Sequence, residues 1–565
     1  MKKTVSYFTL LLPAILIFSC TEKKADTPDM NKEFDTIYAE YERMVMPLMK
    51  ETNLAYWESA TVGTPESYEK TADTEIKLKI FLSDTTRFNA VKKIKESGEI
   101  TDSLKLRMLN TLYNTLLEYQ INPELMKEMV TLSNNIEQKF STYRINLNGK
   151  IITDNDLEDI LRNSVDNKEL ETAWTESKKL GPEVSADIIK LVKLRNKVAQ
   201  SLGYENFHTM SLELSDQNPA DVEKIFNELD SLVTPSFIKL KDEIDTYLSA
   251  RHKISKDQLM PWHYQNRFFQ EAPSIYSIDL DKYYKGKDLV ALTRDYYKSI
   301  GMETQDIMDR SDLFEKPGKN QHAFCTHIDN SGDIRVLCNI KDNSYWMNTM
   351  LHELGHAVYD KYLDKDLPYI LREPAHTFTT EAIAMVFGRM SSNAKWIKDM
   401  TGIEESEAQK ILEESQKMLR LEQLVFSRWA QVMYRFEKSM YANPDQDLNE
   451  LWWNLVEKYQ LLKKPADRNM PDWATKIHIA SSPCYYHNYQ LGELFASQLH
   501  YYIITHFSDN STSNPAYNSY FGNTQAGQFL KDKVFKPGSR YYWNDMIEKA
   551  TGEKLTAKYY AEQFL

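Results

Sequence analysis

Glycine and clustered basic residues are both scarce in this chain of 565 residues. Only 17 residues are glycine, and few segments alternate apolar and polar residues as a half-buried strand does. Apolar residues instead recur every three or four positions, the spacing of one helix face, as at Met418, Leu421, Val425, Trp429 and Val432. The net charge is -13, and no run of five or more basic residues offers a track for phosphates. The composition predicts a mostly helical protein and excludes nucleic acid as a partner.

Long hydrophobic runs are absent after the first twenty residues. Residues 1–3 (MKK) are basic, residues 8–18 (FTLLLPAILIF) are apolar but too short to span a bilayer, and Cys20 follows IFS. This order is typical of a bacterial lipoprotein signal, although Phe18 is larger than that pattern usually holds. We expect a signal peptide at 1–19, a lipidated flexible tether at 20–32, and an exported cell-envelope protein that meets the membrane only through its lipid. The alternative is an ordinary secretory signal with a chance cysteine.

Cysteine is also rare, with four residues in the chain. If Cys20 carries the lipid, three cysteines are left, so at most one internal disulfide can form. Cys325 and Cys338 lie in two strand-like segments, 321–328 and 334–340, joined by the turn sequence DNSGD. A hairpin could pair these thiols, but two reduced core cysteines fit the same pattern, because the sequence does not give their Cα separation. Both alternatives stay open.

The strongest chemical signal is the segment WMNTMLHELGHAVYD at 346–360. Its apolar residues form a helical stripe that would anchor a helix in the core: Met347, Leu351, Leu354 and Val358. His352 and His356 then lie one turn apart on a neighbouring face, where both imidazoles can bind one cation. Glu353 can reach a water on that cation. Zinc suits such ligands, because catalytic zinc sites combine imidazole and carboxylate groups and keep one position for water.

A third metal ligand must come from elsewhere in the chain. No histidine follows in the tight HExxHxxGxxH arrangement, but Glu381 stands 25 residues after His356 in the helical pattern FTTEAIAMVFGRM. A turn near DKDLP would return this second helix along the first and set Glu381 opposite the histidine pair. Considered alone, Glu381 would more often be a solvated helix carboxylate.

The run HELGHAVYDKYLDKDLPYILREPAHTFTTEAI resembles the zinc site of the angiotensin-converting enzyme family of peptidyl-dipeptidases, with its HExGH, DLP, LRE and EAI pattern. His322 in LFEKPGKNQHAF lies 30 residues before His352, as in that family. LWWNLVEKYQ and KIHIASSPCYYHNY are similar to its tryptophan-pair helix and its K-x-H segment. The resemblance implies one catalytic domain, residues 33–565. The implied fold is mostly α, a large helical ellipsoid of the gluzincin type, with a deep central cleft and a small β-hairpin at the active site.

Carried over by position, the resemblance implies that His352, His356 and Glu381 bind one zinc ion per chain. Glu353 is then the general base that takes a proton from water and later delivers it to the leaving amine. A glutamate with no ligand role would be unnecessary in a protein that only binds peptides.

The resemblance also implies groups that contact the substrate. His478 and Tyr489 correspond to the donors that stabilise the tetrahedral oxyanion, although the interval between them is one residue longer than in the family. Lys476 corresponds to the lysine that binds the substrate's C-terminal carboxylate, and Tyr486 would assist it. Tyr485 competes with Tyr486 for that role.

Further positions are weaker or depart from the family. His322 and Ala323 would bind the substrate backbone as an added strand. Gln265 is a loose match to the glutamine that accompanies the family's lysine. Met385 replaces an aspartate that orients a ligand histidine. Asn488 replaces the arginine through which the animal enzymes bind activating chloride, which makes chloride dependence doubtful.

The residues and the resemblance together predict a monomeric zinc metallopeptidase that hydrolyses short peptides and releases C-terminal dipeptides. One alternative is a zinc oligopeptidase or carboxypeptidase with looser recognition of the C-terminus. A second is a peptide-binding lipoprotein without catalysis, against which the intact HExxH motif argues.

Overall fold

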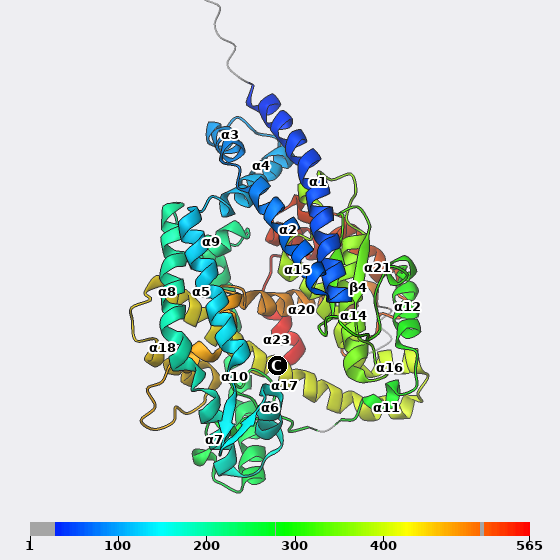
Figure 1. Ribbon diagram of the computed structural model, residues 1–565. Coiled ribbons are helices and arrows are strands. Elements are labelled where there is room, and N and C mark those ends of the chain that lie inside the picture. Colours follow the sequence, from blue (N-terminus) through cyan, green and yellow to red (C-terminus); the bar gives the residue numbers. More distant parts are fainter. Residues whose placement is uncertain (1–28, 277, 509–513) are drawn as a thin grey trace, which may run out of the picture.

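The computed structural model describes residues 29–276, 278–508 and 514–565 (Figure 1). The expected signal peptide and Cys20 lie outside the described residues. Helix α1 (Met30–Val62) begins three residues before the predicted end of the tether, so residues 30–32 are helical. The Asp29 side chain accepts hydrogen bonds from the amides of Asn31 and Lys32, which fixes the helix start, and Met30 is buried. The predicted tether therefore extends too far at this end.

Helices make up nearly all of the regular structure, which confirms the predicted fold class. Residues 30–300 form twelve α-helices: α1 (Met30–Val62), α2 (Pro65–Leu82), α3 (Thr85–Ser97), α4 (Ser103–Glu118), α5 (Pro123–Thr142), α6 (Asp154–Asn163), α7 (Asn167–Ser177), α8 (Leu180–Ser201), α9 (Phe207–Leu214), α10 (Pro219–His252), α11 (Asp281–Tyr284) and α12 (Leu289–Ser299). The rest follow along the described chain: α13 (Gln305–Met308), α14 (Ser344–Lys361), α15 (Thr377–Gly388), α16 (Ala394–Thr401), α17 (Glu405–Ala442), α18 (Leu448–Gln460), α19 (His478–Ser481), α20 (His487–Phe507), α21 (Thr524–Phe529), α22 (Trp543–Thr551) and α23 (Lys558–Phe564).

Among the described residues, no helix combines the length and the apolar character needed to cross a membrane.

The strands of the described residues form two short antiparallel hairpins. Strand β1 (Ile145–Leu147) pairs with β2 (Lys150–Ile152), and β3 (Phe324–His327) pairs with β4 (Ile334–Leu337). The second hairpin is the predicted one, with shorter strands. Cys325 lies opposite Val336, and Cys325, Cys338 and Cys484 are all free thiols. The structure thus has reduced cysteines at the hairpin.

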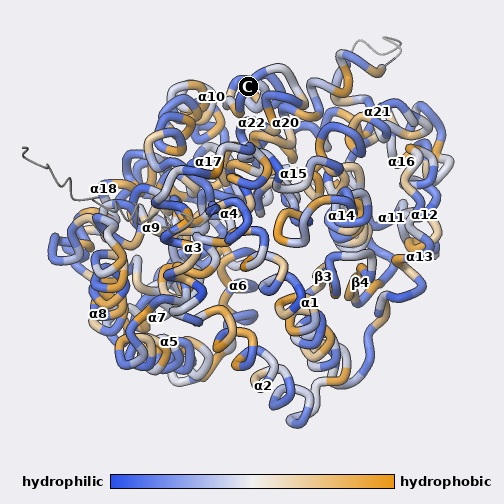
Figure 2. The backbone as a smooth tube through the Cα atoms, turned by 90° about the horizontal axis from the view of Figure 1, so that it is seen from above, coloured by the Kyte–Doolittle hydropathy of each residue, from blue (hydrophilic) through white to orange (hydrophobic). Residues whose placement is uncertain are grey.

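Helix α17 joins two groups of helices that lie side by side in Figures 1 and 2. It packs against α8, α9, α10 and α18 on one side and against α16, α20 and α23 on the other. Hydrophobic and hydrophilic residues alternate along the helices in Figure 2, as expected where each helix buries one face. On α17 the predicted stripe is buried at Leu421, Val425, Trp429 and Val432. One continuous apolar core extends from Leu132 to Phe564.

The first four helices have a smaller core of their own, which Tyr369 joins. The amide of Tyr369 donates to the Glu42 carboxylate at 2.9 Å, and the amide of Ile370 donates to the Tyr38 hydroxyl at 3.3 Å. These bonds attach α1 to the loop between α14 and α15.

Candidate active site

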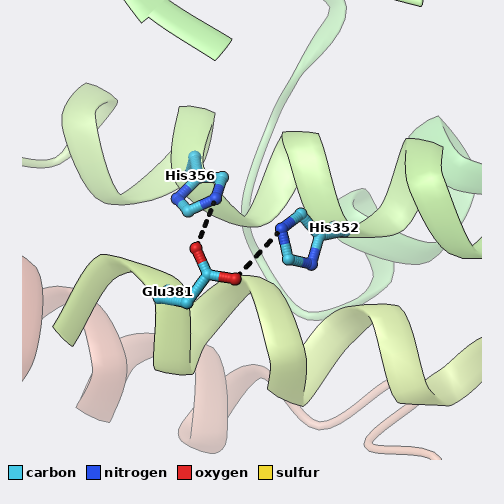
Figure 3. A group of neighbouring side chains, drawn as sticks. All are labelled: His352, His356 and Glu381. Carbon is cyan, nitrogen blue, oxygen red and sulfur yellow. Dashed lines mark ion pairs between the residues drawn. The ribbon is translucent and has the colours of Figure 1, made fainter. Parts of the chain in front are cut away.

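Helix α14 carries the two histidines and is fixed in the core by its opposite face. The Asn343 side chain caps it by accepting from the Trp346 amide at 2.9 Å. The four residues of the predicted stripe are all fully buried: Met347, Leu351, Leu354 and Val358. This burial turns His352 and His356 toward α15 (Figure 3).

Helix α15 lies unusually close to α14 because Gly355 has no side chain. A Cβ at Gly355 would stand 2.7 Å from the Cα of Ala384, which is closer than van der Waals contact allows. The close approach brings Glu381 of α15 opposite the two imidazoles (Figure 3). Gly492 of α20 supports this carboxylate from behind, since a Cβ there would lie 3.4 Å from Glu381 Cγ.

The three candidate ligands converge on one point. His352 Nε2 lies 3.6 Å and His356 Nε2 lies 3.5 Å from different oxygens of Glu381 (Figure 3). Ligand atoms from all three residues lie within 4.8 Å of one another, and no other group of this kind occurs in the described residues. Two imidazoles and one carboxylate at this spacing match the donor set of a catalytic zinc site.

Burial sets the charge of these groups. It lowers the pKa of His352, and it lowers that of His356 to about 3, with His352 adding to the effect. Both rings are therefore neutral, which is the form that binds metals. Burial, reinforced by Glu381, raises the pKa of Glu353 to about 8, while a hydrogen bond from the Cys325 amide acts in the opposite direction. Glu353 is thus a buried acid beside the ligand set.

The ligand His356 is oriented by Thr380, a residue that the sequence interpretation missed. His356 Nδ1 lies 2.8 Å from the Thr380 hydroxyl, which leaves Nε2 facing Glu381. Such a contact fixes the ring and its tautomer. Met385, at the position of the family's aspartate, instead packs beside Gly492. The sequence signal that could have revealed Thr380 is its place directly before the candidate ligand Glu381.

A cavity of about 560 Å³, partly open to solvent, adjoins the ligand set. It is lined by residues of β3, α14, α15 and the segment before α15: Ala323, Phe324, Cys325, His352, Glu353, His356, Asp360, Glu373, Pro374, His376, Thr377, Thr380 and Glu381. Ala323 therefore lies at the cavity. His322 is exposed and is not among the lining residues, and its amide donates to Asn320 at 2.9 Å.

Tyr485 and Tyr489 lie near enough to Glu381 for its charge to act on both hydroxyls. The charge of Glu381 contributes to a raised pKa of both hydroxyls, after burial, and the two rings lie 5.2 Å apart. Tyr485 also contacts the Thr377 hydroxyl at 3.5 Å. His478 stands at the start of α19, where burial and Lys476 lower its pKa to about 4, and its ring lies 5.3 Å from that of Tyr486. Tyr486 in turn contacts Tyr489 at 5.4 Å.

Lys476 is buried among aromatic rings and bonded to a glutamine. Its Nζ donates to Gln270 Oε1 at 2.5 Å and lies 5.4 Å from the ring centres of Trp429 and Tyr486. Burial lowers the pKa of Lys476 to about 8, with Arg267 adding to the effect. Tyr486, and not Tyr485, is thus the neighbour of this lysine.

Gln270 takes the position for which Gln265 was considered. Gln265 is buried elsewhere, and its Oε1 accepts from the Ser274 amide at 2.8 Å. The sequence interpretation missed Gln270 because it considered the glutamine within MPWHYQNRFF, whereas Gln270 directly follows that segment. At Asn488, the Oδ1 atom accepts from Gln217 Nε2 at 2.7 Å, and Gln217 Oε1 contacts His487, so this position holds a network of amides.

Comparison with known proteins decides the family. Residues 29–564 match the peptidase M2 family, described as angiotensin-converting enzyme. The chain belongs to the angiotensin-converting enzyme family. It is 24% identical over 481 residues to an angiotensin-converting enzyme of Theromyzon tessulatum, covering 78% of this chain and 76% of that protein. It is 24% identical over 433 residues to the angiotensin-converting enzyme-like protein Ace3 of Mus musculus, covering 70% of this chain and 57% of that protein. With an angiotensin-converting enzyme of Mesocricetus auratus it shares 21% over 560 residues, covering 92% and 41%.

The chain thus spans 57% and 41% of the length of two of these three relatives. Membership of the angiotensin-converting enzyme family makes the protein a zinc metallopeptidase that acts on peptides. The His352, His356 and Glu381 cluster fits the zinc on which that family depends.

Proposed function

We propose that this protein is a peptidyl-dipeptidase, which removes dipeptides from the free C-terminus of short peptides. The observation that carries the proposal is the buried Lys476, held by Gln270 at 2.5 Å and enclosed by aromatic rings. A lysine in such a place, with no carboxylate bonded to it among the described residues, suits a substrate carboxylate. The Lys476 ammonium lies 5.4 Å from the ring centre of Tyr486, whose ring lies 5.4 Å from that of Tyr489. After burial, the charge of Glu381 contributes to the raised pKa of Tyr489.

The residues around the metal centre have separate tasks. When bound, zinc supplies a water of lowered pKa and polarises the peptide carbonyl. The Glu353 carboxylate takes a proton from the attacking water and delivers it to the leaving nitrogen. His478 and Tyr489 donate hydrogen bonds to the oxygen that becomes negative. The Ala323 backbone and the adjoining β3 edge bind the substrate in an extended conformation.

The test compares one short peptide with a free C-terminal carboxylate and the same peptide as an amide. We expect dipeptide release from the free acid, a drop in kcat/KM of at least tenfold for the amide, and no cleavage with a zinc chelator. Glu353→Gln serves as the matched control and should bind zinc but lose at least about a hundredfold in kcat. Equal cleavage of acid and amide would support the oligopeptidase alternative, release of single residues a carboxypeptidase, and peptide binding without cleavage a non-catalytic binder.

We also propose that the chain is exported, anchored by a lipid on Cys20 and active as a monomer. The sequence of residues 1–20 supports the lipid anchor. Cys20→Ser should release the protein from the membrane fraction with unchanged peptidase activity. Membrane retention of this variant would contradict the lipid anchor.

A further inference from the structure

The cavity beside the metal centre contains more carboxyl groups than the proposed reaction uses. Four carboxylates line it, and none of the lining residues is lysine or arginine. Glu381 belongs to the ligand set and Glu353 to the proposed proton transfer. Asp360 and Glu373 are left without a role in either.

Asp360 and Glu373 belong to different elements that meet at this cavity. Asp360 lies one helical turn after His356 on α14. Glu373 lies in the segment between the short 3-10 helix Tyr369–Leu371 and α15. Asn330 donates a hydrogen bond to the Glu373 carboxylate, while the Asp360 carboxylate has no hydrogen-bond or ion-pair partner among the described residues. After burial, the charge of Glu373 contributes to the raised pKa of Asp360.

Neighbouring basic residues do not neutralise this pair. Lys361 binds Asp306 and the Glu303 carbonyl, and Arg372 Nε donates to the Leu367 carbonyl at 2.8 Å. Burial and, for Asp360, the charge of Glu373 raise the pKa of both acids. Two buried carboxyl groups in one recess without a cation are held in their neutral forms, and a ligand cation would stabilise their charged forms.

The position of the pair points to the part of the substrate that meets it. Lys476 is not among the residues that line this cavity, and the charged groups that act on it are Arg267, Glu271 and Glu158. If the C-terminal dipeptide is bound at Lys476, this cavity, which Lys476 does not line, is the place for the residues that precede the scissile bond. A metal ion is a poorer occupant, because Asp360 and Glu373 belong to no three-residue cluster of possible ligands.

We propose that Asp360 and Glu373 select peptides with a positive charge on the N-terminal side of the scissile bond. The cation is the side chain of arginine or lysine or a free N-terminal amine. This inference names the substrate class of the proposed peptidyl-dipeptidase and rests on that function.

The experiment measures kcat/KM for peptides that share one C-terminal dipeptide. In a first series of N-acetylated peptides, arginine, citrulline or glutamate occupies either the residue before the scissile bond or the one before that. A second series compares peptides with free and with acetylated N-termini. We expect kcat/KM to be about tenfold higher with arginine than with citrulline at one of the two positions, or about tenfold higher with a free than with an acetylated N-terminus. Asp360→Asn and Glu373→Gln should each bring that ratio toward one.

Two variants separate charge recognition from general damage. Asp366→Asn, an exposed acid outside the cavity, should leave the ratio unchanged. Glu373→Lys should reverse the preference toward glutamate, which a merely structural role would not do. Equal cleavage of all peptides by the unaltered protein would overturn this inference and leave the proposed function intact, whereas no cleavage of any peptide would overturn the proposed function itself. A charge preference that calcium abolishes, or that appears only with calcium, would also overturn the proposed role of Asp360 and Glu373.

Discussion

At the scale of single residues, the orientation of His356 depends on one hydroxyl. Thr380→Val removes the contact at 2.8 Å and leaves the imidazole free to turn. We expect zinc affinity to fall about 10- to 100-fold, measured by competition with a chromophoric chelator. Thr380→Ser, which keeps the hydroxyl, should retain most of the affinity, and Thr349→Val on the outer side of α14 should not alter it. Unchanged zinc affinity in Thr380→Val would show that the ring is held by other contacts.

Lys476 makes substrate binding depend on pH. Its pKa is lowered to about 8, so the ammonium is charged below this pH and neutral above it. Attraction for a substrate carboxylate is therefore lost as pH rises. Between pH 7 and 9.5 we expect kcat/KM for a free-acid peptide to fall by about tenfold or more through this group. Lys476→Arg, whose guanidinium stays charged, should lack this decline. An identical decline in the arginine variant would assign the titration to another group.

At this scale, contacts between residues close together in the sequence were easier to predict than contacts between distant residues. His352, His356 and Glu381 were recognisable because helical spacing and one return of the chain bring them together. Gln270 was not, because its contact with Lys476 depends on how distant segments pack. The choice between Tyr485 and Tyr486 needed the structure, since neighbouring residues at the start of α20 point in different directions.

At the scale of elements, the active site depends on how closely α14 and α15 approach. Gly355→Ala would place a methyl group 2.7 Å from the Cα of Ala384, so one helix must shift. We expect a loss of about 1–3 kcal/mol in the free energy of unfolding, measured by urea denaturation, together with weaker zinc binding. Gly492→Ala adds a methyl at 3.4 Å from its neighbours, an ordinary contact, and should cost less. Equal effects of the two substitutions would argue against helix separation as the cause.

Elements themselves were largely predictable. The apolar stripe of α14 and the turn sequence of the β3–β4 hairpin predicted their type, and the structure shortened the strands. The start of α1 was misplaced, because Asp29 was taken as part of a polar tether although it is an N-cap followed by a buried Met30.

At the scale of the whole molecule, zinc should stabilise the fold because its ligands come from two core helices. Zinc at about 100 times its Kd would add about 2.7 kcal/mol to the free energy of unfolding. We expect a chelator to lower Tm and zinc to restore it, measured by calorimetry. Glu353→Gln should show the same shift, since it keeps the ligands, and His356→Ala should show little. A Tm that does not respond to zinc would mean that the folded protein does not bind zinc more tightly than the unfolded chain does.

The metal ligands and the pair formed by Lys476 and Gln270 also differ in how far apart their residues lie in the sequence. The metal ligands span 30 residues, from His352 to Glu381, so the entropy lost in closing that loop is small. By contrast, the bond from Lys476 to Gln270 joins positions 206 residues apart. Metal ligation is therefore a feature of low contact order, and recognition of the substrate's end is one of high contact order. During folding the metal ligands can come together early, whereas the bond between Lys476 and Gln270 must await the docking of two distant segments.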